Sequence, residues 1–307
     1  MSERIEWTDV SPRDGLQSWT REPITTATKV RLVRGLLDAG VPRVEATAFV
    51  SPAWVPQMAD AAAVLGALDA DLLPRLRVLV PNLHGLDLAL EHGVGNVVVT
   101  IGATDSFNQA NVNRSVAESL TELADILTHA DSAGCRVDVA LSVCFGCPYE
   151  GAVDPDRVVQ IAKRLIDLGV VEVGIADTIG VATPPQVRDL CERVGDPAGK
   201  GLSLHVHDTR GLGVANVLAG YAAGVRRFDG SAGGVGGCPF APRSTGNVCS
   251  EDALQALVAE GADSGVDLRR LCAASATLAS DLSAELPGKL YRAGMWTGEP
   301  LEEMSSA

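Results

Sequence analysis

The sequence predicts a (β/α)₈ barrel, and three observations support this fold class. Short runs rich in Val, Ile and Leu alternate along the chain with stretches of helical periodicity. Eight such runs occur, and with the helices between them they span about 250 residues, the usual size of this barrel. The runs are almost continuously apolar, as parallel strands are when both of their faces are buried.

Each unit begins with a predicted strand and continues with a predicted helix. The strands are Ile5–Val10, Arg43–Phe49, Leu76–Val80, Asn96–Ile101, Arg136–Val143, Val171–Ala176, Leu202–His207 and Arg226–Gly230. The helices between them include Thr26–Ala39, Ser115–Ala133, Asp154–Leu168, Pro184–Val194 and Gly213–Ala223. Helix starts are supported by Asp154 and Thr183, since each is a capping residue followed by Pro. Helix ends are supported by glycines such as Gly40 and Gly169.

A doubly wound open sheet is the alternative fold for alternating strands and helices. Its fingerprint, G-x-G-x-x-G, would lie between the first strand and the first helix. Residues 11–15 (SPRDG) occupy that turn and do not match, and Gly211–Gly213 follows the seventh strand and lacks the third Gly. A closed barrel is therefore preferred. We expect it over residues 1–265, with a C-terminal helical extension over residues 266–307 whose last residues are frayed.

Composition and charge limit the classes of function. The 307 residues are 46% hydrophobic and 21% charged, which is typical of a globular enzyme. The net charge of −14 disfavours binding to nucleic acid, because a polyanion would be repelled. No run approaches the roughly 18 consecutive apolar residues of a membrane-spanning helix. Residues 1–10 (MSERIEWTDV) lack the pattern of a secretory signal. We therefore expect a cytoplasmic protein without a membrane partner.

The seven Cys residues indicate reduced thiols, since their number is odd and no export signal is recognisable. Cys144 and Cys147 form a C-x-x-C, a spacing found in redox and zinc sites. No second Cys pair follows to complete a zinc site, and residues 148–151 (PYEG) resemble a turn rather than the start of a redox helix. A structural role for this pair is preferred.

Polar residues at the ends of the predicted strands mark the expected active site, because barrel enzymes build their sites there. The residues in these positions are Asp14, Glu45, Asp177, His205 and His207, followed by Cys238 and Asn247 after strand eight. Six of the ten residues in segment 230–239 are Gly or Pro. We expect this segment to be a mobile loop over the barrel mouth.

Two of the five His residues, His205 and His207, lie two positions apart on a predicted strand. Side chains alternate across a strand, so both imidazoles face the same side and can share one cation. Asp14 is the expected third ligand, and an amide oxygen of Asn247 completes a set of nitrogen and oxygen ligands. This set suits Mg²⁺ or Mn²⁺, and Zn²⁺ less well. The alternatives are two separate core histidines and an Arg13–Asp14 pair that caps a turn.

Cys238 lies between glycines and a proline on the segment that we expect to cover the site. A thiol in this position can transfer a proton to or from the substrate. It can also act as a nucleophile, which would make the protein a cysteine hydrolase without a metal requirement. A third alternative is a small buried residue without a chemical role.

A non-catalytic barrel used only for binding is an alternative for the protein as a whole. Such a barrel would tolerate the loss of Cys238 or Arg13.

Several motifs together resemble the 3-hydroxy-3-methylglutaryl-CoA lyase family, over residues 5 to 260. They are residues 11–17 (SPRDGLQ), 44–52 (VEATAFVSP), 54–60 (WVPQMAD), 146–151 (GCPYEG), 177–180 (DTIG), 205–209 (HVHDT), 236–241 (GGCPFA) and 245–247 (TGN). The set is specific, whereas R-D-G or H-x-H-D alone would not be.

The resemblance implies a lyase that cleaves 3-hydroxy-3-methylglutaryl-CoA to acetoacetate and acetyl-CoA. It implies four metal ligands, which are Asp14, His205, His207 and Asn247. Arg13 would stabilise the developing enolate, and Cys238 would transfer a proton. Glu45 and Asp177 would orient the substrate and adjacent groups, with Asp177 also a candidate acid or base. Two further substrate contacts are expected at Gln17 and Asn111. The expected partners are an acyl-CoA substrate and a second copy of the chain in a homo-oligomer, most simply a dimer.

Neighbouring families of the same fold fit less well. The corresponding motif of condensing synthases resembles H-x-H-N-D, whereas this chain has HVHD at residues 205–208. Those synthases also carry an additional C-terminal domain. Biotin-linked carboxyltransferases use a modified lysine as a metal ligand, whereas the four Lys residues here lie in helix or loop patterns. Two departures from the lyase pattern concern Gln109-Ala110, before Asn111, and Arg243-Ser244. They leave open a lyase for citramalyl-CoA or for another 3-hydroxy-3-alkylglutaryl-CoA.

Overall fold

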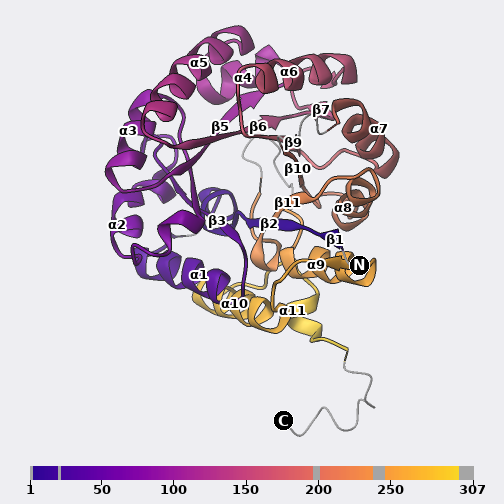
Figure 1. The fold of residues 1–307 in the computed structure, drawn as a ribbon. Coiled ribbons are helices and arrows are strands. Elements are labelled where there is room, and N and C mark those ends of the chain that lie inside the picture. Colours follow the sequence, from indigo (N-terminus) through magenta and orange to yellow (C-terminus); the bar gives the residue numbers. More distant parts are fainter. Residues whose placement is uncertain (1–2, 20–21, 196–200, 238–245, 297–307) are drawn as a thin grey trace, which may run out of the picture.

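The computed structural model describes residues 3–19, 22–195, 201–237 and 246–296. It contains a closed barrel of eight parallel strands in the order β10-β11-β2-β3-β4-β5-β6-β9. Helices alternate with these strands along the chain and form a ring around them (Figure 1). The (β/α)₈ barrel predicted from the sequence is therefore confirmed.

Each barrel strand agrees with its predicted counterpart to within one residue at either end. The strands are β2 (Glu6–Asp9), β3 (Arg43–Ala48), β4 (Leu76–Leu79), β5 (Asn96–Gly102), β6 (Arg136–Ser142), β9 (Glu172–Asp177), β10 (Leu202–Val206) and β11 (Arg227–Gly230). The first strand, β2, pairs in parallel with β3 on one side and with the last strand, β11, on the other. The N-terminal strand thus closes the ring.

The helices cover the outside of the barrel. They are α1 (Thr26–Asp38), α2 (Ala61–Gly66), α3 (Leu83–Glu91), α4 (Asp105–Val112), α5 (Val116–Ser132), α6 (Pro155–Asp167), α7 (Pro184–Val194), α8 (Gly213–Ala222), α9 (Ser250–Ala259), α10 (Leu268–Asp281) and α11 (Leu290–Ala293). The predicted caps are present: the side chain of Asp154 accepts a hydrogen bond from the backbone N–H of Asp156, and Thr183 forms a capping box with Gln186. Within the described residues, no helix is both long and apolar enough to span a membrane.

Three of the strands that lead to the expected site end one residue away from their predicted limits. β2 ends at Asp9, one residue earlier than predicted, because residues Ser11–Gly15 form a π-helical turn, η1. β10 likewise ends before His207, which instead forms an isolated bridge with Asn247. β9 extends one residue further than predicted and includes Asp177.

Short elements complete the fold at both ends of the barrel. β1 (Glu3–Arg4) pairs with β12 (Ala262–Asp263), and β7 (Gly146–Cys147) pairs with β8 (Gly151–Ala152) around the predicted turn. The described residues also include the 3₁₀ turns η2 (Pro56–Met58), η3 (Leu73–Arg75) and η5 (Ala232–Gly234).

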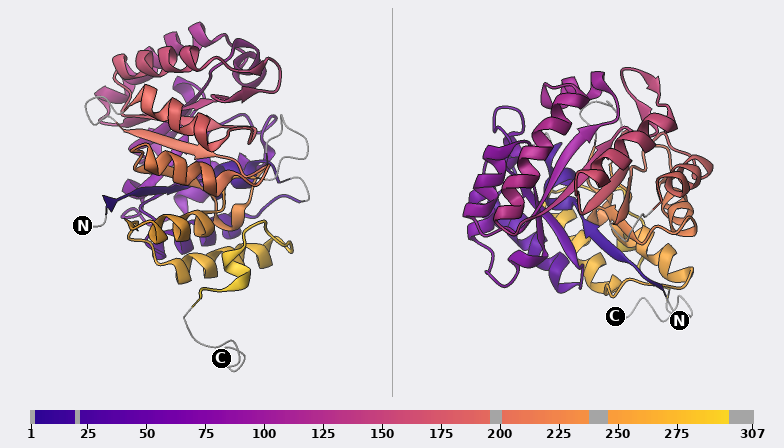
Figure 2. Two further views of the ribbon diagram at one scale, coloured as in Figure 1. Left: turned by 90° about the vertical axis from the view of Figure 1, so that its right-hand side faces the viewer. Right: turned by 45° about the horizontal axis from the view of Figure 1, so that its top comes forward.

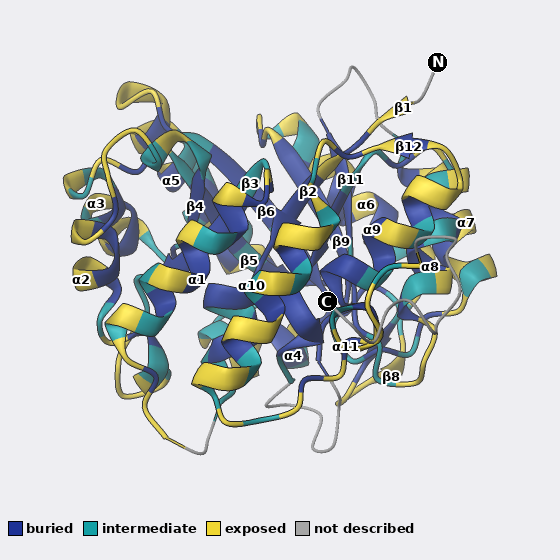
Figure 3. Cartoon of the chain, turned by 90° about the horizontal axis from the view of Figure 1, so that it is seen from below, coloured by how far each residue is buried: buried dark blue, intermediate teal, exposed yellow. Residues whose placement is uncertain are grey.

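The barrel strands and the inner faces of the helices are buried (Figure 3). At the closing seam Trp7 of β2 stacks on Phe228 of β11 with ring centroids 6.4 Å apart. Beyond the barrel, α10 lies beside α1, and α11 follows α10 in the chain (Figure 2). The two helices pack so closely that a side chain at Gly35 of α1 would contact Ala274 of α10. Residues 297–307, for which a frayed tail was predicted, lie outside the described residues.

Candidate metal and active site

Asp14, His205 and His207 meet at the C-terminal end of the barrel strands. Asp14 lies in η1 directly after β2, His205 is on β10, and His207 follows that strand. One potential ligand atom from each of the three side chains lies within 4.8 Å of the other two. The structure therefore brings three of the four predicted metal ligands into one cluster.

The two imidazoles face each other, with Nε2 of His207 3.1 Å from Nε2 of His205. Burial, reinforced by His205, lowers the pKa of His207 to about 4, so this ring is neutral near pH 7 and offers a lone pair. Nδ1 of His205 lies 3.8 Å from Oδ2 of Asp229, on the other side of the ring. Nε2 is therefore the nitrogen that His205 directs at the cluster.

Asn247, the fourth predicted ligand, joins the cluster from the segment after β11. Its Nδ2 donates to Oδ2 of Asp14 at 2.8 Å. Within the described residues, Oδ1 of Asn247 and Nδ1 of His207 are buried without a hydrogen-bond partner. A half-turn of the amide would direct Oδ1 at the cluster. Buried unpaired polar atoms are rare, and this donor set of imidazole, carboxylate and amide groups fits a divalent cation.

Arg13 places a permanent positive charge beside the cluster. Its Nη1 donates to Oδ1 of Asp14 at 2.8 Å, and its Nε donates to Oε1 of Glu45. Burial opposes the charged guanidinium, but Glu45 and Asp14 outweigh this effect and raise the pKa of Arg13. Among the described residues, Nη2 of Arg13 has no hydrogen-bond partner. Arg13 can therefore donate to an oxygen anion held at the cluster.

Asp9 anchors the turn that carries Arg13 and Asp14. Its Oδ1 accepts from the backbone N–H of Ser11 at 2.9 Å, and its Oδ2 accepts from the hydroxyl of Ser250 at 2.7 Å. Burial raises the pKa of Asp9 to about 6, although these hydrogen bonds oppose the shift. Asp9 was not among the predicted site residues, since it lies inside the first strand and one turn before the recognisable motif.

Two other predicted site residues lie near the cluster and already have partners. Nε2 of Gln17 donates to Oδ1 of Asp14 at 2.7 Å. The carboxylate of Asp177 accepts from the backbone N–H groups of Val181 at 2.9 Å and Ala182 at 3.0 Å. Burial raises the pKa of Asp177 despite these bonds. Asp177 therefore holds the backbone of the loop after β9, and an acid or base role for it stays a prediction.

The remaining predicted residues are not part of the cluster that the structure describes. Asn111 is exposed on α4, the helix that follows β5. Cys238 lies outside the described residues, as do Arg243 and Ser244. Substrate contact by Asn111 and proton transfer by Cys238 stay predictions.

A family model described as HMGL-like matches residues 4–278. The chain belongs to the HMGL-like family. It is 41% identical over 305 residues to (R)-citramalyl-CoA lyase of Chloroflexus aurantiacus, covering 95% of each chain. It is 40% identical over 277 residues to hydroxymethylglutaryl-CoA lyase of Pseudomonas mevalonii, covering 89% of this chain and 91% of that one.

A solved structure of an HMG-CoA lyase from Acinetobacter baumannii, in complex with coenzyme A and 3-methylmalate, superposes with a TM-score of 0.90. The two chains are 34% identical, and the match covers 97% of this chain and 98% of that one. The family resemblance predicted from the motifs is thus confirmed, and this HMGL-like protein is a carbon–carbon lyase.

In this HMGL-like barrel, sequence reasoning missed a network of charged side chains beneath the cluster. Five unpredicted residues connect to one another and to Glu45 in the barrel interior: Arg43, Arg77, Asp138, Glu172 and Asp229. Each lies inside a strand, and charges within otherwise apolar strands are the signal that could have found them. Their pairing is not visible in the sequence, because the partners come from different strands.

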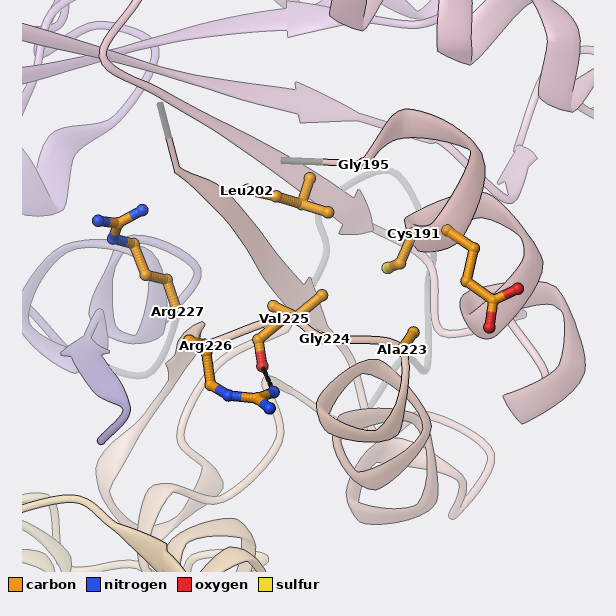
Figure 4. Close-up of a pocket in the computed structure, with 9 residues that line it drawn as sticks. Cys191, Gly195, Leu202, Ala223, Gly224, Val225, Arg226 and Arg227 are labelled. Atoms are coloured by element: carbon orange, nitrogen blue, oxygen red, sulfur yellow. Dashed lines mark hydrogen bonds between the residues drawn. The ribbon is translucent and has the colours of Figure 1, made fainter. Parts of the chain in front are cut away.

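A cavity of about 300 Å³ lies at the opposite end of the barrel from the cluster (Figure 4). Its lining includes Leu202 and Arg227, the first residues of β10 and β11. The two arginines that line it are already paired, Arg226 with Glu3 and Arg227 with Glu6. In (β/α)₈ barrel enzymes the chemistry occurs at the C-terminal strand ends, so this cavity is not part of the site.

Proposed function

We propose that this lyase cleaves 3-hydroxy-3-methylglutaryl-CoA to acetoacetate and acetyl-CoA with the help of a divalent cation. The observation that carries the proposal is the juxtaposition of Asp14, His205 and His207 with the cationic Arg13. A site for a hard cation lies beside a donor for an oxygen anion, which is the pair of functions that cleavage of a 3-hydroxyacyl thioester needs.

Asp14, His205, His207 and Asn247 would hold the cation. Their oxygen and nitrogen donors, without thiolate, favour Mg²⁺ or Mn²⁺ over Zn²⁺. When bound, such a cation supplies a Lewis acid that acidifies a coordinated hydroxyl group.

In the proposed reaction a base, for which Asp177 is the candidate, takes the proton of the tertiary hydroxyl, which becomes the carbonyl of acetoacetate. The bond between C2 and C3 breaks, and its electron pair moves into the thioester to form an enolate. Arg13 would donate from Nη2 to the enolate oxygen, while Glu45 fixes the guanidinium through Nε. Cys238 would give a proton to the enolate carbon, which yields acetyl-CoA. Asp177 is the proposed second acid or base, and Gln17 and Asn111 are proposed substrate contacts.

Citramalyl-CoA is the second candidate substrate. The observation that favours it is the 41% identity to (R)-citramalyl-CoA lyase, which extends over 95% of both chains. Citramalyl-CoA also has a tertiary hydroxyl at C3, but a carboxylate is attached directly to that carbon. The same bond cleavage would give pyruvate and acetyl-CoA, so the two candidates differ only in the oxo acid released.

The test offers both thioesters to the purified protein with Mg²⁺ or Mn²⁺ and identifies the oxo acid and acetyl-CoA by mass spectrometry. We expect acetoacetate from 3-hydroxy-3-methylglutaryl-CoA and loss of activity with a chelator. Pyruvate as the faster product would select the second candidate. Release of free CoA that persists with chelator, together with an acylated Cys238, would indicate a cysteine hydrolase instead.

We also propose that the protein forms a homodimer. Light scattering of the purified protein, which measures the molar mass in solution, would test this.

A further inference from the structure

Arg77 is a buried arginine that lies below the site rather than in it. It is the second residue of β4 and only 3% exposed. In the barrel order β4 and β11 are separated by β2 and β3. Arg77 nevertheless reaches residues on both β3 and β11, so its side chain extends across the barrel interior.

Of the four carboxylates among the described residues that the guanidinium of Arg77 contacts, those of Glu45 and Asp229 lie closest to it. Its Nε donates to Oε2 of Glu45 at 2.8 Å, and its Nη2 lies 2.6 Å from the same oxygen. Nη2 also donates to Oδ2 of Asp229 at 3.2 Å. In the barrel register Glu45 lies beside Arg77 itself, and Asp229 lies beside His205.

Each of these two carboxylates has a second partner in the site above. The other oxygen of Glu45 accepts from Nε of Arg13. Oδ2 of Asp229, the oxygen that Arg77 contacts, lies 3.8 Å from Nδ1 of His205. A carboxylate behind a metal-binding imidazole fixes the orientation and basicity of the ring. One guanidinium is thus shared between the residue that orients Arg13 and the residue that faces His205.

We propose that Arg77 is a positioning residue that fixes Arg13 and His205 relative to each other through Glu45 and Asp229. The inference rests on the proposed function, since it assigns His205 to the cation and Arg13 to the enolate. The guanidinium makes these contacts through two nitrogens, Nε and Nη2, held in one rigid plane, whereas a lysine offers a single ammonium on a flexible chain. Arg77, which lies beneath the substrate site, therefore sets the distance between His205 at the cation and Arg13 at the enolate.

Arg43 provides a matched control in the same interior network. It too is a largely buried strand arginine, and it bonds Asp138 at 3.2 Å and Glu172 at 2.8 Å. Among the described residues it has no hydrogen bond or ion pair with Glu45 or Asp229. Arg43→Lys therefore changes the same chemical group without touching the two carboxylates that support the site.

The experiment measures the Kd of Mn²⁺ by titration calorimetry and kcat at saturating Mn²⁺ for wild type, Arg77→Lys and Arg43→Lys. We expect Arg77→Lys to raise the Kd about tenfold or more and to lower kcat, with Arg43→Lys close to wild type. Equal effects of the two substitutions, or none, would overturn the inference. If wild type itself binds no Mn²⁺, the proposed metal centre fails, which is a separate result.

Asp229→Asn keeps the inference testable if Arg77→Lys does not fold, because it removes one charge and preserves the volume. We expect it to weaken Mn²⁺ binding, while an unchanged Kd would exclude the path through Asp229. Where both variants fold, the loss of Mn²⁺ affinity in the double variant should be smaller than the sum of the two single losses, since Arg77 acts on His205 through Asp229. Additive losses would contradict this coupling.

Discussion

Replacing Asp9 by Asn tests the electrostatic environment beneath η1. Asp9 is fully buried, and burial raises its pKa from 3.8 to about 6. The folded protein therefore binds a proton on Asp9 more tightly than the unfolded chain does. The stability contributed by this proton is fully present below the unfolded pKa of 3.8 and is lost as the pH rises through about 6.

The size of the effect follows from the two pKa values. Between about pH 4.5 and 7.5 the wild type loses about 2 kcal/mol of unfolding free energy through this group. Asn cannot ionise, and its amide keeps one acceptor for Ser11 and gains a donor for the hydroxyl of Ser250. The unfolding free energy of Asp9→Asn, relative to wild type, should therefore rise by about 2 kcal/mol across that range.

Urea unfolding at several pH values, analysed by linear extrapolation, measures this difference. Asp131→Asn on the exposed side of α5 serves as the control, because it makes the same change in net charge at the surface. A difference between Asp9→Asn and wild type that stays constant with pH would refute the reasoning. It would show that the hydrogen bonds from Ser11 and Ser250 fully compensate the burial of the charge.

Three further substitutions test the site and its framework. Asp14→Asn should lower the content of bound metal measured by elemental analysis, and full occupancy would remove Asp14 from the ligand set. Cys238→Ala should retain the metal and lose most turnover of the acyl-CoA, whereas an unchanged kcat would exclude the thiol from the reaction. Gly180→Ala should lower the unfolding free energy by about 1–3 kcal/mol. The reason is that Gly180 has a φ of +61° and a Cβ there would lie 2.6 Å from Oγ1 of Thr209; an unchanged Tm would show that this loop relaxes.

The sequence predicted the barrel well because its strands and helices differ strongly in local pattern. Strand limits agree to within one residue, and Asp154 begins its helix as its side chain predicts. The grouping of Asp14 with His205 was also predictable, since all strands of a parallel barrel end on the same face. The π-helical form of residues Ser11–Gly15 was not, because it depends on anchoring by Asp9 and by distant backbone.

The pairing of the charged side chains inside the barrel could not be predicted from the sequence. Arg77 and Asp229 are 152 positions apart, and only the closure of the ring brings them together. Asp177 shows a different limit. Its position at a strand end predicted a chemical role, whereas its two hydrogen bonds to the backbone of the following loop depend on a turn geometry that the motif does not reveal.

The pairing of β2 with β11 has a consequence for how the protein is held together. Asp14 follows one strand of this seam, and Asn247 follows the other, with His205 on the next strand along. Any ligand that bridges these side chains binds the closed ring and not an opened one. By mass action, occupancy of the site must therefore resist separation of β2 from β11, and loosening of this seam must favour release of the ligand. Asp14, Asn247 and His205, joined through the ligand, would hold the beginning and the end of the barrel together.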